Sequence, residues 1–94
     1  MTEVSTASRV TLSEDVLFQE LQGSAVLLDL KTGVYFGLDR VGTRIWQLLG
    51  ERPNVAQDVE AMMSEFDVAA ERCAADVIAL VRQLEEQGLV AVTE

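Results

Sequence analysis

The chain has 94 residues, of which 49% are apolar, and its 16 acidic against 7 basic side chains give a net charge of −9. This length suits one domain, and so many apolar residues exclude a disordered chain. Phosphate binding needs clustered Lys and Arg, whereas this chain has one lysine and scattered arginines, so nucleic acid is not expected as a partner. The absence of histidine and the presence of one cysteine exclude His-based catalysis and ordinary zinc sites, so we expect no enzyme activity, metal or cofactor.

Residues 1–8 are polar and show no period, which predicts a disordered tail before a domain over 9–94. This segment lacks the apolar core of a signal peptide, and no apolar run reaches the ~20 residues that span a bilayer. Cys73 has no partner for an internal disulfide. Together these features predict a cytoplasmic protein.

Three apolar runs, 16–18, 25–30 and 34–38, predict an antiparallel three-stranded meander. Lys31-Thr32-Gly33 suits a three-residue hairpin loop closed by Gly33 in the left-handed region. That loop length pairs Leu30 with Val34 and Phe36 with Leu28. Alternation then predicts two apolar faces, Val26, Leu28 and Leu30 on the second strand and Val34, Phe36 and Leu38 on the third.

From Asp39 the apolar period becomes helical, which predicts helices near 40–49, 55–65 and 68–87. Asp39 and Asn54 are expected N-caps, Gly50 and Gly88 are expected to end the first and third helices, and the third is expected to begin at Asp67. Gly42 inside a helix suggests close approach to another backbone. Cys73, Trp46, Met62 and Met63 are interpreted as core residues, and 89–92 as a short closing strand.

Strands followed by helices define an α+β domain with the helices on one side of the sheet, similar to winged-helix proteins. The third strand is an edge of this meander, and Val34-Tyr35-Phe36-Gly37-Leu38 carries no charge and no proline. Native proteins normally protect such an edge, so this one is either covered by the protein itself or used to add a partner strand.

Residues 27–39, LLDLKTGVYFGLD, resemble the strand pair of the PqqD-like family, named for the pyrroloquinoline quinone biosynthesis protein D. Residues 41–49, VGTRIWQLL, resemble its first helix. Phe66-Asp67, Asp76-Val77 with Leu80 and Leu84, and 88–90 resemble its closing portion. The similarity covers roughly residues 9–92, and the order of these segments is more specific than any one of them.

The resemblance implies a non-catalytic domain that recognises the leader segment of ribosomally made precursor peptides and presents the peptide to a separate enzyme. The leader adds a strand to the third strand and lies against the third helix. The segments 16–21 and 35–39 are most similar to stand-alone members of lasso-peptide pathways, whose partner is a leader protease. Members that serve radical enzymes are the alternative.

Carried over by position, the resemblance implies two groups of peptide-binding residues. They are Val34, Tyr35, Phe36, Gly37 and Leu38 on the third strand, and Ala69, Arg72, Asp76, Leu80, Gln83 and Gln87 on the third helix. Alternation favours Phe36 as a core residue and Tyr35 as a ligand contact. Asp76 matches a recurrent position of the family, and the alternative interpretation is a solvated carboxylate with no role in binding.

Two further functions stay open from the residues alone. Winged helices commonly bind DNA, although the third helix mixes Arg72 and Arg82 with four carboxylates. The second alternative is that the chain is a structural or regulatory subunit of another complex. No membrane partner is expected, and the sequence does not identify the leader, the enzyme or the oligomeric state.

Overall fold

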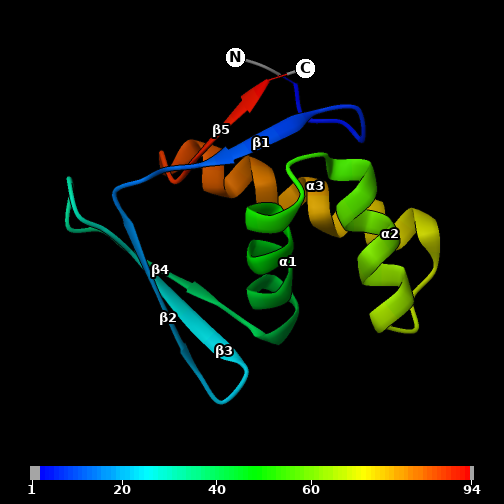
Figure 1. The fold of residues 1–94 in the computed structure, drawn as a ribbon, viewed down its shortest axis with the longest axis horizontal. Coiled ribbons are helices and arrows are strands. Elements are labelled where there is room, and N and C mark those ends of the chain that lie inside the picture. Colours follow the sequence, from blue (N-terminus) through cyan, green and yellow to red (C-terminus); the bar gives the residue numbers. More distant parts are fainter. Residues whose placement is uncertain (1–2, 94) are drawn as a thin grey trace.

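The computed structural model describes residues 3–93. Figure 1 shows a three-stranded sheet on one side of α1 and α2 on the other side, with α3 passing behind α1 and a short two-stranded sheet at one end. The expected α+β class, with a meander followed by three helices, is confirmed. The elements are β1 (Arg9–Leu12), β2 (Val16–Leu21), β3 (Ser24–Asp29), β4 (Tyr35–Leu38), α1 (Arg40–Glu51), α2 (Val55–Glu65), α3 (Ala70–Glu86) and β5 (Val90–Thr93).

The meander has the antiparallel order β2-β3-β4, but its second hairpin differs by one residue from the expected register. Leu27 lies opposite Phe36, and Leu28 lies opposite Tyr35. The loop therefore has four residues, 30–33, with Gly33 in the left-handed region at φ 75° as expected. The expected three-residue loop is wrong because the Asp29 carbonyl accepts from the Gly33 N–H at 2.7 Å, and Asp29 Oδ1 accepts from the Lys31 N–H at 2.9 Å.

This register reverses the expected face of β3. Ala25 and Leu27 are buried, whereas Val26 is 42% exposed and Leu30 56% exposed. Both sets of alternate positions in β3 are apolar, so alternation alone does not select the buried face. Packing against the helices selects the face that carries the fully buried Leu27.

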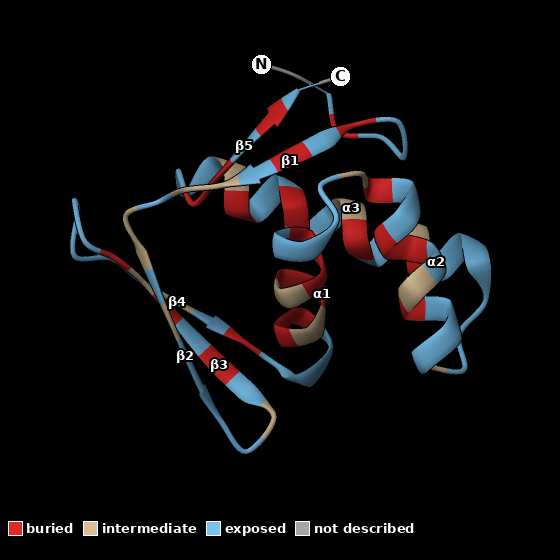
Figure 2. Cartoon of the chain, viewed as in Figure 1, coloured by how far each residue is buried: buried red, intermediate tan, exposed pale blue. Residues whose placement is uncertain are grey.

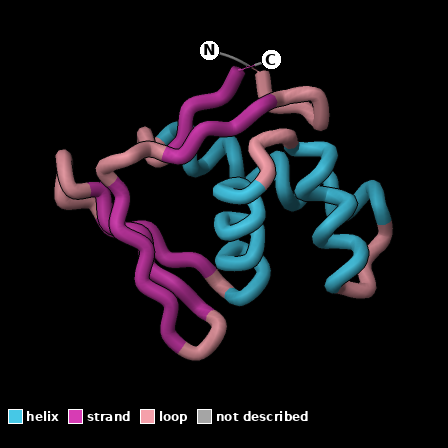
Figure 3. The backbone as a smooth tube through the Cα atoms, viewed as in Figure 1, coloured by secondary structure: helices cyan, strands magenta, loops and turns pink. Residues whose placement is uncertain are grey.

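A fourth strand precedes the meander and was not expected. β1 pairs with β5 at the C-terminal end, with Val10 opposite Val92, and does not join the meander. Figure 3 shows these two strands side by side, apart from the other three. The closing strand was expected, but its partner lies about eighty residues away in the sequence, beyond the reach of local patterns.

The caps of α1 and α2 are confirmed. The Asp39 side chain accepts from the Gly42 N–H at 2.7 Å, and the Asn54 side chain accepts from the Gln57 N–H at 3.2 Å. Gly50 does not end α1, which continues through Glu51, whereas Gly88 follows α3 at φ 74° as expected.

Three other expectations about the helices are wrong. The third helix begins at Ala70, not Asp67, and has no side-chain cap. Met63 is 39% exposed and is not a core residue, although Met62 is buried. The tight surroundings of Gly42 are side chains: an added Cβ would lie 3.2 Å from Asp39 Oδ1 and 3.3 Å from Leu38.

The core forms around α1, which packs against the inner face of the meander and against α2, and it continues through α3, β1 and β5; Figure 2 shows buried positions on all of these elements. Trp46 and Cys73 are buried, as expected. The Cys73 thiol donates weakly to the Val59 carbonyl at 3.6 Å. A buried thiol in this setting acts as a small apolar side chain.

Residues 3–8 pack against the protein, in contrast to the expected disordered tail; residues 1 and 2 lie outside the described residues. Val4 and Ser8 are buried. The Ser8 and Thr6 carbonyls accept from the first two N–H groups of α2, those of Val55 and Ala56, at 3.1 and 3.0 Å. Because the first turn of a helix leaves its N–H groups unpaired, this segment supplies acceptors that the helix needs.

Candidate functional site

The open edge of the meander is β4. Its backbone direction follows from the hairpin, where the Asp29 N–H donates to the Val34 carbonyl at 3.0 Å. Antiparallel ladders alternate, so Phe36 and Leu38 also direct their backbone groups toward β3. Tyr35 and Gly37 direct theirs away from β3. In the described residues no strand pairs with β4 on that side, and Tyr35 is 70% exposed. This edge therefore offers N–H and C=O groups to a partner strand.

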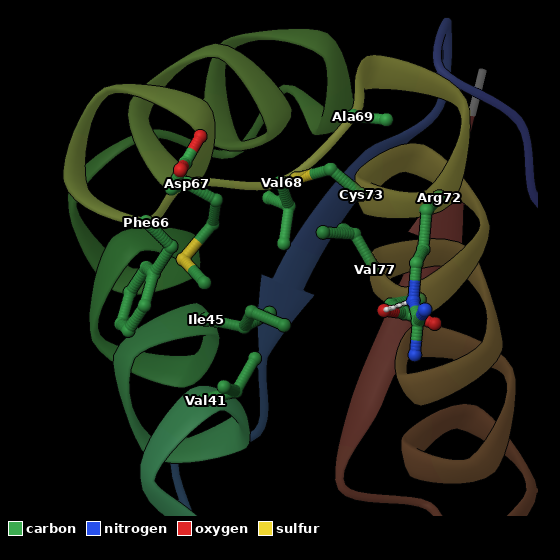
Figure 4. A pocket seen from close by; sticks show the side chains of 11 residues that line it. Val41, Ile45, Phe66, Asp67, Val68, Ala69, Arg72, Cys73 and Val77 are labelled. Carbon is green, nitrogen blue, oxygen red and sulfur yellow. Dashed lines mark ion pairs between the residues drawn. The ribbon is translucent and has the colours of Figure 1, made fainter.

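An apolar cavity of about 460 Å³ lies beside α3. Figure 4 shows Val41 and Ile45 of α1 facing Val77 of α3 across it, with the loop between α2 and α3 closing one end. The loop contributes Phe66, Asp67, Val68 and Ala69. The lining is mostly apolar, which suits hydrophobic side chains of a ligand.

A second cavity of about 370 Å³ continues the first toward β4. Val41, Ile45 and Asp76 line both cavities, so the two form one groove between α1 and α3. Its near end is lined by Asp39 and Gly42, directly after β4. We call this combined cavity the α1–α3 groove.

The α1–α3 groove brings together most of the helix positions expected from the resemblance. They are Ala69, Arg72, Asp76, Leu80 and Gln83. Gln87 lines neither cavity. The five strand positions also line neither, so strand edge and groove are adjacent surfaces joined at Asp39. Leu38 is 5% exposed, and its side chain belongs to the core.

The sequence interpretation missed the contribution of α1 and, apart from Ala69, of the loop before α3. Val41 was assigned to the buried stripe of its helix, yet it is 39% exposed. The signal for the loop was weak, because Phe66 and Val68 look like ordinary core residues in the sequence. Only the packing of α1 against α3 shows that these side chains line a groove.

The charges at the groove are few. Arg72 Nε lies 4.0 Å from Asp76 Oδ2, and their side chains are 80% and 60% exposed. Such an exposed pair is weak, so both groups are free to contact a ligand. Burial, and secondly the Asp76 carboxylate, raise the pKa of the Cys73 thiol, which disfavours its nucleophilic thiolate.

The described residues contain no group of three or more His, Cys, Asp or Glu side chains placed to hold a metal ion. None of the helices within residues 3–93 combines the length and apolar character needed to cross a bilayer.

Fold and site together define a winged-helix-like α+β domain with an open sheet edge beside an apolar groove. The family model described as Coenzyme PQQ synthesis protein D (PqqD) matches residues 24–90, and this chain belongs to the PqqD family. The match spans the meander from β3, all three helices and the start of β5.

Two solved structures are similar over most of their length. One, described as TbiB1 in complex with the TbiA(beta) leader peptide, is 37% identical at a TM-score of 0.79, over 84% of this chain and 92% of that one. The other, described as lasso peptide synthetase B1 complexed with the leader peptide, is 26% identical at a TM-score of 0.78, over 88% and 98%. No curated protein sequence matches this chain.

Proposed function

We propose that this chain is a non-catalytic recognition protein that binds the leader segment of a ribosomally made precursor peptide in lasso-peptide biosynthesis. It delivers the bound precursor to a leader protease or another modifying enzyme. The open β4 edge beside the α1–α3 groove carries this proposal. Both solved relatives are described as leader-peptide complexes, which supports the same ligand here.

The proposed binding mode is strand addition to β4. The backbone groups of Tyr35 and Gly37 form hydrogen bonds with the backbone of the leader. These bonds contribute affinity that does not depend on the side chains of the leader. Val34 and Tyr35 contribute contacts along the strand edge. The chain of the leader then passes Asp39 and enters the α1–α3 groove, where Ala69, Leu80 and Gln83 line its path. Apolar leader side chains fill the groove and supply specificity.

Arg72 and Asp76 give the groove its polar recognition. Both are exposed and only weakly paired, so a leader carboxylate can contact Arg72 and a leader amide or basic group can contact Asp76. Phe36 and Leu38 act through the fold, because they hold the edge strand against β3 and the core.

The second candidate is a partner of a radical enzyme, the alternative that the sequence resemblance implies; the family description, a protein of PQQ synthesis, is compatible with it. Both candidate functions include leader binding, so they are distinguished by which enzyme the chain binds, a leader protease or a radical enzyme. A structural subunit binds no leader, and a DNA-binding protein shows salt-sensitive duplex affinity. The net charge of −9 argues against DNA binding.

The test is fluorescence polarisation with the labelled leader of a short precursor identified by searching the genes around that of this chain. We expect saturable binding, and amide shifts on titration concentrated in residues 33–39 and 69–87. A scrambled leader of the same composition is the control. Equal affinity for the scrambled peptide, or shifts confined to α2, would contradict the proposal.

A further inference from the structure

The side of the meander that faces away from the helices carries an apolar surface. The register places Leu17, Leu28 and Tyr35 in one cross-strand row, with Leu28 between the other two. Val26 lies two residues along β3 on the same face, since side chains alternate along a strand. Leu21 at the end of β2 and Leu30 at the hairpin extend this outer face, and we call these six residues the outer-face patch.

Nothing in the described part of the chain covers this patch. Leu21 is 77% exposed, Leu30 56% and Leu17 48%. Single exposed leucines are ordinary, but several neighbours on one sheet face mark an interaction surface. The α1–α3 groove opens on the helical side, so a ligand in the groove leaves the patch free.

Electrostatics argue against a second copy of this chain as the occupant. Each copy carries a net charge of −9, so packing two copies face to face brings like charges together. Acidic residues lie at the Leu30 end of the patch, where the Leu30 N–H donates to the Asp15 carbonyl at 2.8 Å and the neighbouring Glu14 is exposed. The one lysine of the chain, Lys31, is already paired with Asp15 at 3.0 Å. An apolar surface with a basic rim is complementary to this arrangement.

The position of Tyr35 indicates which protein would carry that surface. Tyr35 belongs to the patch through its side chain and to the open edge of β4 through its backbone. A peptide strand added to β4 continues the sheet, so its outward side chains lie beside Tyr35 on the same face. A protein bound to the patch therefore lies next to the captured peptide.

We propose that the outer-face patch docks the enzyme that acts on the captured precursor, through an apolar surface with basic residues at its rim. This inference rests on the proposed function. In this arrangement the two functions use different surfaces. The precursor peptide binds at the β4 edge and in the α1–α3 groove, and the enzyme docks on the side of the sheet that faces away from the helices.

The test uses a purified leader protease identified by searching the genes around that of this chain, with Leu17→Gln/Leu30→Gln as the variant. Met63→Gln is the matched control, because Met63 is 39% exposed on α2 and lines neither cavity. Affinity for the protease is measured by calorimetry, leader affinity by polarisation, and folding by thermal melting. We expect the double variant to weaken protease binding at least about tenfold, with leader affinity and melting unchanged.

Protease binding by the double variant at the affinity of the control would overturn the docking surface, as would a wild-type chain that binds no protease. A concentration-dependent dimer that the double variant abolishes would assign the patch to a second copy instead. A chain that binds the protease through the patch but binds no leader would refute the proposed function and leave the docking surface standing.

Discussion

Leu27 of β3 lies directly opposite Phe36 of β4, and both side chains pack into the core. Their neighbours, Leu28 and Tyr35, are paired with each other on the outer face. One pair thus anchors the edge strand, and the other belongs to the exposed surface.

This pairing predicts unequal effects of two adjacent truncations. Leu27→Ala removes a fully buried side chain and should lower the free energy of unfolding by about 2–5 kcal/mol. Leu28→Ala makes the same chemical change on the outer face and should cost less than about 1.5 kcal/mol. Urea denaturation of both variants checks the difference. A larger loss for Leu28→Ala would show that the register is one residue off.

Backbone alternation predicts opposite effects of proline at two neighbouring positions. Tyr35→Pro removes an N–H that points away from β3, so the fold should survive while leader binding weakens by about 1–3 kcal/mol. Phe36→Pro breaks a ladder bond and removes a core aromatic, which alone costs about 3–5 kcal/mol and could unfold a domain of this size.

Thermal melting by circular dichroism and leader affinity by polarisation should be measured for both proline variants. A folded Tyr35→Pro variant with full leader affinity would rule out strand addition on β4. If Tyr35→Pro unfolds and Phe36→Pro melts like the wild type, the backbone directions are reversed.

The α1–α3 groove predicts a binding defect from Val41→Arg. Val41 lines both cavities and is 39% exposed, so a charged side chain there should block apolar leader contacts without unfolding the protein. We expect about a tenfold or greater rise in the leader Kd. Met63→Arg, at the same exposure on α2, is the control and should bind normally. Equal leader affinity for the two variants would place the peptide outside the groove.

The N-cap of α1 predicts a stability difference between two aspartates. Asp39→Ala removes the 2.7 Å acceptor for the Gly42 N–H and should destabilise the fold by about 0.5–2 kcal/mol. Asp67→Ala lies before α3, which begins at Ala70 without a side-chain cap, and should have little effect. Denaturant midpoints test this, and a greater loss for Asp67→Ala would contradict the observed caps.

A buried carboxyl predicts an unusual pH dependence. Asp58 is fully buried, and neither side-chain oxygen has a hydrogen-bond partner. Burial raises its pKa from 3.8 to about 7, although the charge of Arg52 acts in the opposite direction. The folded state thus holds its proton more tightly than the unfolded state. The contribution of this group to stability is therefore full below pH 3.8 and is lost as the pH rises toward 7.

Asp58→Asn, which stays neutral, should therefore be more stable than the wild type above pH 7, by no more than about 4 kcal/mol. The two proteins should converge near pH 4. Glu60→Gln, an exposed carboxylate on the same helix, controls for the change in net charge. Denaturation curves across pH 4–8 give the comparison, and parallel profiles for wild type and Asp58→Asn would show that Asp58 is not a buried acid.

The local sequence determined the order and type of the elements. Asp39 and Asn54 each place a side-chain acceptor before an apolar helical period, and Gly33 and Gly88 occupy the left-handed positions that other residues avoid. These signals act within a few residues. The strands of the meander, the three helices and the closing strand could therefore be predicted, and the positions on α3 that line the groove followed from the family resemblance.

Tertiary structure decided what depends on residues far apart in the chain. The pairing of Val10 with Val92 joins the two ends of the sequence, and the buried face of β3 was chosen by packing, because both of its faces are apolar. The α1–α3 groove likewise depends on the fold, because Val41 of α1 and Val77 of α3 are far apart in the sequence and face each other only in the folded chain. Local propensity carries no information about such contacts, since they are stabilised by the shared burial of surfaces that meet only in the folded chain.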